Sequence, residues 1–368
     1  MEKSKVYFTN LRTTFDCNLL QKLKKLITAA GIGNIDFTNK YAAIKIHFGE
    51  PGNLAFLRPN YAKVVADTVK ELGGKPFLTD CNTLYVGGRK NALDHLDAAY
   101  ENGFSPFSTG CHVLIADGLK GTDETLVPIA GDYVKEAKIG TAIMDADVFI
   151  SLTHFKGHEA TGFGGCLKNI GMGCGSRAGK MEMHSSGKPH VVQEKCVGCG
   201  SCQKDCAHSA ITITDRKASI DHAKCVGCGR CIGACPKDAT HAGADNTNEI
   251  LNCKMAEYAL AVVQGRPQFH INLVQDISPC CDCHGCNDAP ILPDIGMFAS
   301  ADAVAIDQAC ADACLRAEPI PGTRLSEMPH ISDDHFINSY PVSEWRSQLS
   351  HGEKIGLGQR AYELITMK

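Results

Sequence analysis

The sequence predicts an α/β fold, a mostly parallel sheet with flanking helices, into which a small cysteine-rich module is inserted. Short β-branched or aromatic runs alternate with helix-length segments through the first 155 residues, and the alternation resumes after residue 242. Between these parts, eight of the 20 cysteines lie from Cys196 to Cys235. Alternating strands and helices favour right-handed crossovers between parallel strands. We therefore expect one α/β domain, formed by residues 1–186 and 243–368, with an insertion at 187–242.

The first part of the chain supplies most of the expected sheet. Each strand prediction rests on a β-branched or aromatic run, and each helix prediction on apolar residues three or four positions apart. The predicted strands are 6–9, 42–48, 76–80, 112–116 and 148–153, and the predicted helices are 17–30, 60–72 and 91–102. Gly73 and Gly74 follow the second helix, as is common at a helix C-terminus.

A glycine-rich segment follows the last of these strands. Eight of the 23 residues from 157 to 179 are glycine, which predicts a loop system whose backbone approaches another group closely. Residues 185–189 look like a linker. In the second part we expect a helix at 250–264, a strand at 268–274, a helix at 301–317 capped by Ser300 or Asp302, and a C-terminal helix at 359–367.

Composition narrows the class of protein. The chain has 368 residues, is 44% hydrophobic and 21% charged, and carries a net charge of −4, which is ordinary for a soluble globular protein. A weakly acidic chain is not expected to bind nucleic acid or an anionic membrane. No apolar run reaches the ~18–20 residues of a membrane span, and the N-terminus lacks a signal-like run. We therefore expect a cytoplasmic protein with reduced thiols that serve as ligands, not disulfides.

The inserted module contains two cysteine runs of the same spacing. Each run places three cysteines two residues apart and a fourth after three more, and Pro236 follows the second run, whereas Ala207 follows the first. This is the bacterial dicluster ferredoxin pattern, in which the fourth cysteine of each run ligates the other cluster. We assign one 4Fe-4S cluster to Cys196, Cys199, Cys202 and Cys235, and the second to Cys225, Cys228, Cys231 and Cys206. Zinc is the alternative, but it favours paired CxxC units.

A second group of cysteines lies between residues 280 and 286. Within seven residues it contains four thiols, Cys280, Cys281, Cys283 and Cys286, and His284. Three interpretations stay open: a third iron–sulfur cluster, zinc or another thiophilic ion, and reduced structural thiols. The remaining cysteines are expected to be mostly buried thiols, with Cys310, Cys314, Cys17, Cys81 and Cys111 as the plainest cases.

Polar residues gather where the predicted strands end. Because ligands bind outside the carboxyl ends of parallel strands, these residues are candidates for one site. The candidate catalytic residues are His47, His154, His158 and Lys168, and the candidate cofactor- or substrate-binding residues are Arg58, Asp80, Gly162, Gly164 and Gly165. Histidines move protons or bind metals near neutral pH, while glycine N–H groups and a lysine bind anions. The alternatives are a solvated basic loop and buried packing histidines; for His95, packing is preferred.

These motifs together resemble a known family. His47-Phe-Gly-Glu, Arg58-Pro, the residues from Thr79 to Tyr85, the glycine segment from His158 to Gly171, and Pro293-Asp294-Ile-Gly with Ser300-x-Asp302 resemble the iron–sulfur family catalogued as domain of unknown function 362, in its variant with a dicluster ferredoxin module. The resemblance covers nearly the whole chain. It implies iron–sulfur binding in anaerobic bacteria or archaea and supplies no known reaction.

A weaker resemblance is to the nickel-pincer lactate racemase superfamily. His158, the glycines at 162, 164 and 165, and Lys168 are similar in kind to a stretch of its N-terminal domain, with Cys166-Leu167 inserted before the lysine. The resemblance implies that His158 and Lys168 lie at a cofactor or substrate site.

Three functions remain. The preferred one is an iron–sulfur oxidoreductase whose two clusters feed a site in the α/β domain, with a redox protein as partner and a small anionic substrate. The second is a ferredoxin-like electron carrier or scaffold without its own catalysis. The third is a pincer-type racemase or isomerase. The oligomeric state stays open, with a homodimer as one option.

Overall fold

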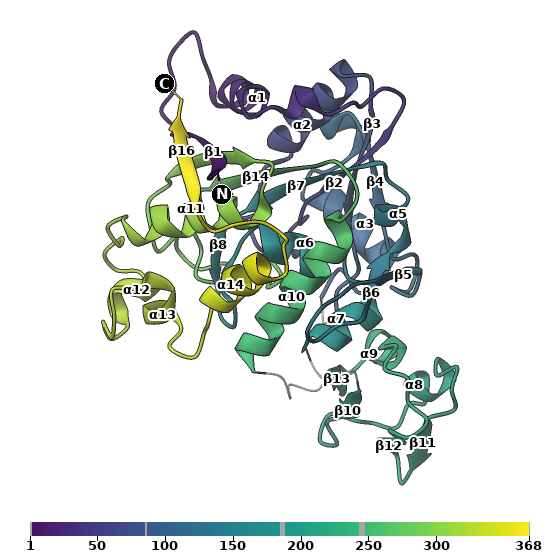
Figure 1. Cartoon of the computed structure of the whole chain (residues 1–368). Helices are drawn as coiled ribbons and strands as arrows, with labels where there is room; N and C mark the ends of the chain where they lie inside the picture. Colours follow the sequence, from purple (N-terminus) through teal and green to yellow (C-terminus); the bar gives the residue numbers. More distant parts are fainter. Residues whose placement is uncertain (1, 85–86, 185–187, 243–246, 368) are drawn as a thin grey trace.

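The computed structural model describes residues 2–84, 87–184, 188–242 and 247–367. An eight-stranded sheet forms the centre of the molecule (Figure 1). Its strands, in spatial order, are β16 (Tyr362–Thr366), β1 (Ser4–Thr9), β15 (Gly296–Ser300), β14 (Gln268–Val274), β7 (Val148–His154), β2 (Tyr41–Lys45), β3 (Lys75–Asp80) and β4 (His112–Ile115). β15 runs antiparallel to both of its neighbours, and the other pairs are parallel. The predicted α/β class with a mostly parallel sheet is confirmed.

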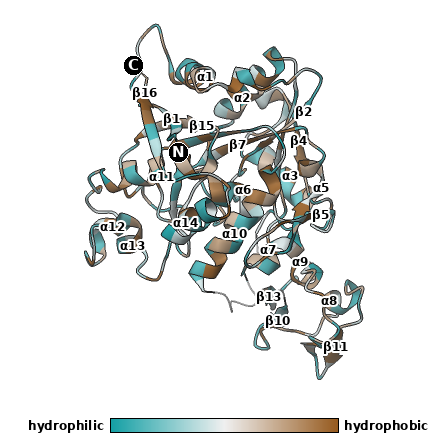
Figure 2. Ribbon diagram, viewed as in Figure 1, coloured by the Kyte–Doolittle hydropathy of each residue, from teal (hydrophilic) through white to brown (hydrophobic). Residues whose placement is uncertain are grey.

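Helices cover both faces of the sheet, and each face has its own core. On one face Leu26 and Val65 pack with Ile44 and Ile150 of neighbouring strands. On the other, Ile170 and Ala259 pack with Phe149. The helices of the first face are α1 (Leu19–Ala29), η1 (Ile32–Asn34), α2 (Pro59–Glu71), α3 (Ala92–Glu101) and α4 (Pro106–Thr109); those of the second are α5 (Thr141–Met144), α6 (Cys166–Cys174), α7 (Arg177–His184), α10 (Asn248–Val263), α11 (Ala303–Leu315) and α14 (Arg346–Lys354). α10 is hydrophobic over much of its length (Figure 2), as suits a helix buried on nearly every side.

Smaller elements complete the body. Two hairpins are β5 (Glu124–Pro128) with β6 (Glu136–Gly140), and β8 (Lys156–His158) with β9 (Gly162–Gly164); two short helices are α12 (Arg324–Glu327) and α13 (His335–Ser339). As expected, Asp302 caps α11, because its Oδ1 accepts from the backbone N–H groups of Val304 and Ala305 at 2.9 Å. None of the helices in the described ranges is long and apolar enough to cross a membrane.

Two secondary-structure predictions are wrong. The C-terminal helix expected at 359–367 is instead strand β16, because β1 offers a free edge on which Ser4 to Phe8 pair with Tyr362 to Thr366. The glycine segment at 157–179 is not mainly loop, since α6 and part of α7 lie in it. A close backbone approach is nevertheless present: a Cβ on Gly171 would lie 2.0 Å from the carbonyl oxygen of Met255 on α10.

Residues 188–242 form a small lobe beside α7 (Figure 1). It contains β10 (Pro189–Val191) paired with β13 (Thr240–Ala242), the hairpin β11 (Ile211–Thr214) with β12 (Lys217–Ile220), and the helices α8 (Ser201–Lys204) and α9 (Arg230–Ala234). Its core continues into the body through Leu84 and Met181. Part of the linker expected at 185–189 lies outside the described residues. We call this part of the chain the cysteine lobe.

Candidate functional site

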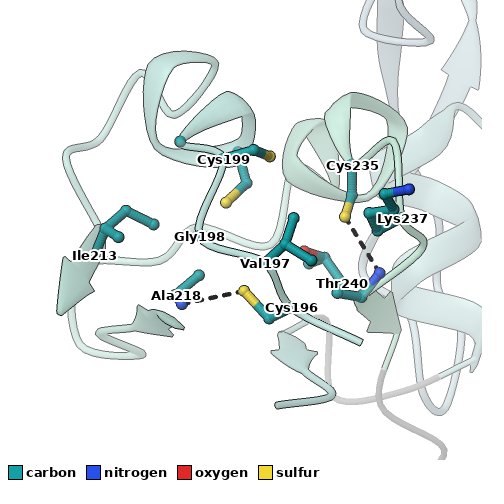
Figure 3. A pocket seen from close by; sticks show the side chains of 12 residues that line it. Cys196, Val197, Gly198, Cys199, Ile213, Ala218, Cys235, Lys237 and Thr240 are labelled. Carbon is teal, nitrogen blue, oxygen red and sulfur yellow. Dashed lines mark hydrogen bonds between the residues drawn. The ribbon is translucent and has the colours of Figure 1, made fainter. Parts of the chain in front are cut away.

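The eight cysteines of the cysteine lobe line two pockets, four to each pocket. The first pocket is lined by Cys196, Cys199, Cys202 and Cys235, and the second by Cys206, Cys225, Cys228 and Cys231. In each case three cysteines come from one run and the fourth from the other. Figure 3 shows Cys235 facing the loop of Cys196 and Cys199 across the first pocket.

Repeated local geometry places these thiols. Gly198 and Gly227, the second residue after the first cysteine of each run, have φ of 66° and 76°. This left-handed conformation favours glycine and wraps the chain around the pocket. A short helix then begins in each run, α8 and α9, and carries Cys202 and Cys231.

Backbone amides point at three of the sulfurs. Ala218 donates to Cys196 Sγ over 3.3 Å, Ala210 to Cys206 Sγ over 3.4 Å, and Ala239 to Cys235 Sγ over 3.2 Å. The bond from Ala218 is drawn in Figure 3. Such bonds stabilise thiolate charge and tune a bound metal centre.

The spacing of the thiols separates two kinds of metal site. Zinc with Zn–S distances of about 2.3 Å would hold its sulfurs about 3.8 Å apart. Among the described residues, no three thiols of either pocket have sulfur atoms that all lie within 4.8 Å of one another. The group that meets this limit is Asp132, Glu257 and His351, outside both pockets. A cube with one thiolate on each of four irons holds its thiolates further apart, so the wider pockets fit a cluster better than a single ion.

The Asp132, Glu257 and His351 group is already satisfied by the protein. Glu257 accepts from the backbone N–H groups of Asp132 and Val134 at 2.7 Å and lies 2.8 Å from His351 Nε2. These contacts tie α10 to the loop before β6 and to α14, which is a structural role.

A second polar group lies at the carboxyl ends of β2, β3 and β7, as expected for His47, Asp80 and His154. His47 Nε2 lies 3.0 Å from Arg89 Nη1, and Arg89 Nε donates to Glu50 Oε2 over 2.7 Å. Burial, followed by the charge of Arg89, holds the pKa of His47 well below its usual value, so this ring is neutral. Lys45 pairs with Asp80 at 3.0 Å. We call His47, Glu50, Lys45, Asp80 and Arg89 the buried ion network.

His154 connects the sheet edge to the loop at 280–286. Its Nδ1 lies 2.8 Å from Asp282 Oδ2, its Nε2 lies 2.8 Å from the carbonyl oxygen of Gln275, and Lys156 Nζ lies 3.5 Å from Asp282. Burial alone would raise the pKa of Asp282, but His154 and Lys156 hold it below its usual value. Both ring nitrogens of His154 therefore face acceptors, and this histidine anchors the loop.

His158 and Lys168 meet the same loop at Cys281. Lys168 Nζ donates to Cys281 Sγ over 3.2 Å. The pKa of Cys281 is held well below its usual value by a hydrogen bond with Cys283, then by the charges of Lys168 and Lys156 and a hydrogen bond from His158. Burial alone would lower the pKa of Lys168, but the charges of Cys281 and Cys283 outweigh burial and hold it above its usual value. Lys168 and Cys281 therefore form a buried, hydrogen-bonded pair.

The four cysteines of residues 280–286 do not share one environment. Cys281 is 1% exposed and interacts with Cys283. Cys280 instead lies 3.8 Å from Tyr340 Oη, and Cys286 is exposed. Of the described residues, no three here have ligand atoms within 4.8 Å of each other, so a tetrahedral zinc site is not preformed.

Of the glycines and the arginine predicted to bind a cofactor or substrate, only some lie at this site. A Cβ on Gly164 would lie 3.3 Å from Lys156 Nζ and 3.4 Å from Lys168 Cδ, so this glycine leaves room for both lysines. Gly162 instead packs against Trp345. Arg58 is exposed at the start of α2, and among the described residues its charge acts on Tyr61.

A carboxylate of the protein itself lies beside Gly165. Asp307 on α11 accepts from the backbone N–H groups of Cys166 and Leu167 at 2.7 and 2.8 Å. The start of α6 is therefore occupied by a carboxylate of this chain. The expectation that the N–H groups of Gly162, Gly164 and Gly165 bind an anion stays a prediction.

Outside these sites the thiol predictions are mostly confirmed. The buried cysteines include Cys81, Cys111, Cys310 and Cys314. Cys17 is only partly buried, 3.3 Å from Lys25 Nζ, because it precedes α1 in an exposed loop. His95 is fully buried in α3 and packs edge-on to Phe48, as expected.

Several residues of the site were missed by sequence reasoning. They are Lys45, Arg89, Lys156 and Asp282. Lys45 could have been recognised as a site residue, since a lysine inside the apolar run Ala42–Ile46 is unusual in a buried strand. Arg89 could not, because its pairing with Glu50 joins two loops far apart in the sequence.

Comparison with known proteins places these residues in context. A family profile described as "Domain of unknown function (DUF362)" matches residues 42–312. No curated protein matches. Similar solved structures include the lactate racemase apoprotein from Thermoanaerobacterium thermosaccharolyticum, with a TM-score of 0.36 and 10% identity over 74% of this chain and 51% of that one. Another is a protein from Thermotoga maritima, with a TM-score of 0.41 and 13% identity over 81% of this chain and 57% of that one. This chain thus spans about half the length of each.

Proposed function

The chain belongs to the family described as domain of unknown function 362, and from this premise we propose that it is an iron–sulfur oxidoreductase. Two 4Fe-4S clusters held by the cysteine lobe would supply electrons one at a time to a site at the sheet edge. That site comprises the Lys168–Cys281 pair, His158 and the buried ion network. The description of the family names no reaction, so the proposal rests on the residues of this chain.

The arrangement of eight cysteines carries the proposal. Two equivalent pockets, each with three thiols from one run and one from the other, are what two cubes with exchanged fourth ligands require. The amides that donate to Cys196, Cys206 and Cys235 add the hydrogen bonds that such thiolates use. A cytoplasm that keeps thiols reduced suits both the clusters and their assembly.

One continuous segment joins the cysteine lobe to the sheet edge. α7 carries Met181, which packs in the core of the cysteine lobe, and ends at His184. Burial lowers the pKa of His184 to about 3, and the charges of Lys168 and His158 lower it as well. The α6–α7 segment therefore runs from the Lys168–Cys281 pair to the cysteine lobe, which supports electron delivery between them.

The charges at the sheet edge favour a small anionic substrate. Lys156 and Lys168 lie beside Gly164, and Arg89 is buried with one nitrogen, Nη2, that has no hydrogen-bond partner among the described residues. A buried guanidinium N–H is costly to leave unpaired, so a carboxylate or phosphate oxygen is a suitable acceptor. His158 is placed to exchange a proton there, since its Nδ1 is held by the N–H groups of Ala160 and Thr161 at 3.1 Å.

A redox protein would supply the electrons from outside. Cys199 is exposed, and Val197 and Val226, which follow the first cysteine of each run, are 44% and 60% exposed. Apolar groups around an accessible cluster ligand are suited to a transient protein contact.

Anaerobic metal analysis with EPR tests the proposal. We expect about eight irons and eight sulfides per chain, from four per cube. Cys235→Ser should disturb the cluster of the first run, and Cys206→Ser that of the second, each leaving one EPR signal intact. Zinc in place of iron, or loss of the signal expected to survive, would contradict it. About twelve irons would add a third cluster at Cys280–Cys286, and eight irons with one zinc would place zinc there.

An electron carrier without its own catalysis is the second candidate. It is favoured by one observation, that Asp307 already fills the anion position at the start of α6. It predicts that His158→Ala and Lys168→Met leave every reaction of the reduced protein unchanged, whereas the oxidoreductase proposal predicts a loss of substrate turnover.

A further inference from the structure

Arg177 of α7, in the α/β body, lies against Gly229, which lines the second pocket. Arg177 is 2% exposed. A Cβ on Gly233 would lie 1.5 Å from its Nη1, and one on Gly229 would lie 2.9 Å from its Cγ. The side chain therefore covers the loop and helix that carry Cys228 and Cys231. Its Nη2 donates to the carbonyl oxygen of Lys90, which fixes the guanidinium from the side of the body.

The charges that act on Arg177 come from the α/β body and from the second pocket. Burial lowers the pKa of Arg177, while Asp117, Cys231, Asp205 and Cys228 act to raise it. Both of these cysteines line the second pocket. The arginine remains protonated because its ordinary pKa is so high.

The lysine and arginine among the described residues that line the two pockets are less buried than Arg177. Lys237 lines the first pocket (Figure 3) but is exposed. Arg230 lines the second pocket but is only partly buried. Solvent screens an exposed charge far more than a buried one, so the buried Arg177 charge is screened less than those of Lys237 and Arg230.

We propose that Arg177 raises the reduction potential of a cluster held at the second pocket and thereby sets the direction of electron flow, from the first pocket to the second. Reduction adds one negative charge, and a buried cation beside it stabilises the reduced form. One electron leaves a reduced centre at the first pocket, which becomes oxidised, and reduces the centre at the second pocket. An external redox protein replaces the electron at the exposed Cys199 side.

This inference rests on the proposed function and names a positioning residue, since Arg177 acts through the cluster. The second pocket would then be the exit of the cysteine lobe, where α7 leads toward the sheet edge. The first pocket would be the entry, because Cys199 is exposed.

The test is an anaerobic redox titration followed by EPR on the full-length, cluster-loaded protein. In Arg177→Gln we expect one of the two midpoint potentials to become more negative, by about tenfold in the one-electron equilibrium constant or about 59 mV. The other potential should stay the same. Arg177→Lys, which keeps the charge, should restore much of the difference.

Lys224→Gln is the matched control. It also removes one positive charge beside the second pocket, next to Cys225, but the Lys224 side chain is 63% exposed and faces Asp221 at 3.5 Å. We expect less than about a threefold change in the equilibrium constant, because solvent screens this charge.

The outcomes separate this inference from the proposed function. No shift in Arg177→Gln, equal shifts of both potentials, or the same shift in Lys224→Gln would overturn the role of Arg177. If Arg177→Gln does not fold, Gly233→Ala pushes the guanidinium away without removing it and should give a smaller negative shift; an unchanged potential there also overturns the role. A wild-type protein without two clusters overturns the proposed function instead.

Discussion

At the scale of single residues, buried charges decide how the loops of this protein are held. Asp282 joins His154 and Lys156, Arg89 joins Glu50 and His47, and Asp307 takes two amides of α6. Each pair brings together segments far apart in the sequence. Because an unpaired buried charge is costly, such contacts fix one arrangement of the loops.

Asp307 gives a pH-dependent prediction. Burial raises its pKa from 3.8 to about 6, although the amides of Leu167 and Cys166 lower it. A carboxyl with a raised folded-state pKa binds protons more tightly in the folded state, so its contribution to stability falls as pH rises. Between pH 5 and 7 we expect Asp307 to account for a loss of about 1 kcal/mol in the free energy of unfolding.

Urea unfolding at pH 5 and 7 checks this expectation. Asp307→Asn should reduce the difference between the two pH values by about 1 kcal/mol relative to wild type. Burial also raises the pKa of Asp117 to about 6. Asp117→Asn should therefore reduce the difference between the two pH values in the same way as Asp307→Asn. An unchanged pH dependence in Asp307→Asn would show that its pKa is ordinary.

At the scale of elements, α6 depends on its glycines for its position. Gly171 allows the backbone of α6 to approach α10, since a Cβ there would lie 2.0 Å from the carbonyl oxygen of Met255. Backbone cannot move aside cheaply, unlike the end of a flexible side chain. The contact sets where Lys168, on the same helix, meets Cys281.

Gly171→Ala should therefore destabilise the protein by about 3 kcal/mol, as overpacking does in a well-packed core. Gly175→Ala, at the C-cap of the same helix, is the matched control. Its Cβ would lie 2.9 Å from Met183 Cε, the end of a flexible apolar side chain, so we expect a loss of about 1 kcal/mol or less. Chemical denaturation of both variants measures the difference, and equal losses would argue against the backbone contact.

At the scale of the whole molecule, the two described ends of the cysteine lobe lie side by side. Pro189 and Ala242 lie opposite each other in the β10–β13 pair, so the described chain enters and leaves the cysteine lobe at neighbouring residues. Such an arrangement is expected for a module inserted into a loop of a complete domain.

Removal of the cysteine lobe tests that division. A chain in which residues 189–242 are replaced by a short glycine linker should keep the α/β sheet and its cooperative thermal unfolding, and should bind no cluster iron. We expect some loss of stability, since Met181 and Arg177 would become exposed. Circular dichroism and iron analysis measure both outcomes; an unfolded product would show that the two parts fold together.

The sequence alone determined the α/β class, the strands at whose carboxyl ends His47, Asp80 and His154 lie, and the grouping of eight cysteines. These features are local: strand alternation and cysteine spacing are set by neighbours along the chain. The same local rules failed for β16, because its pairing depends on a free edge of β1 at the other end of the chain.

Only the tertiary structure decided which charges meet. It placed Arg89 beside His47, Lys168 beside Cys281, Asp307 at the start of α6, and Arg177 beside the second pocket. Each contact joins residues separated by tens to more than a hundred positions, and many sequences of the same pattern would leave these charges in solvent. Burial and pairing are properties of the packed molecule, so local pattern does not specify them.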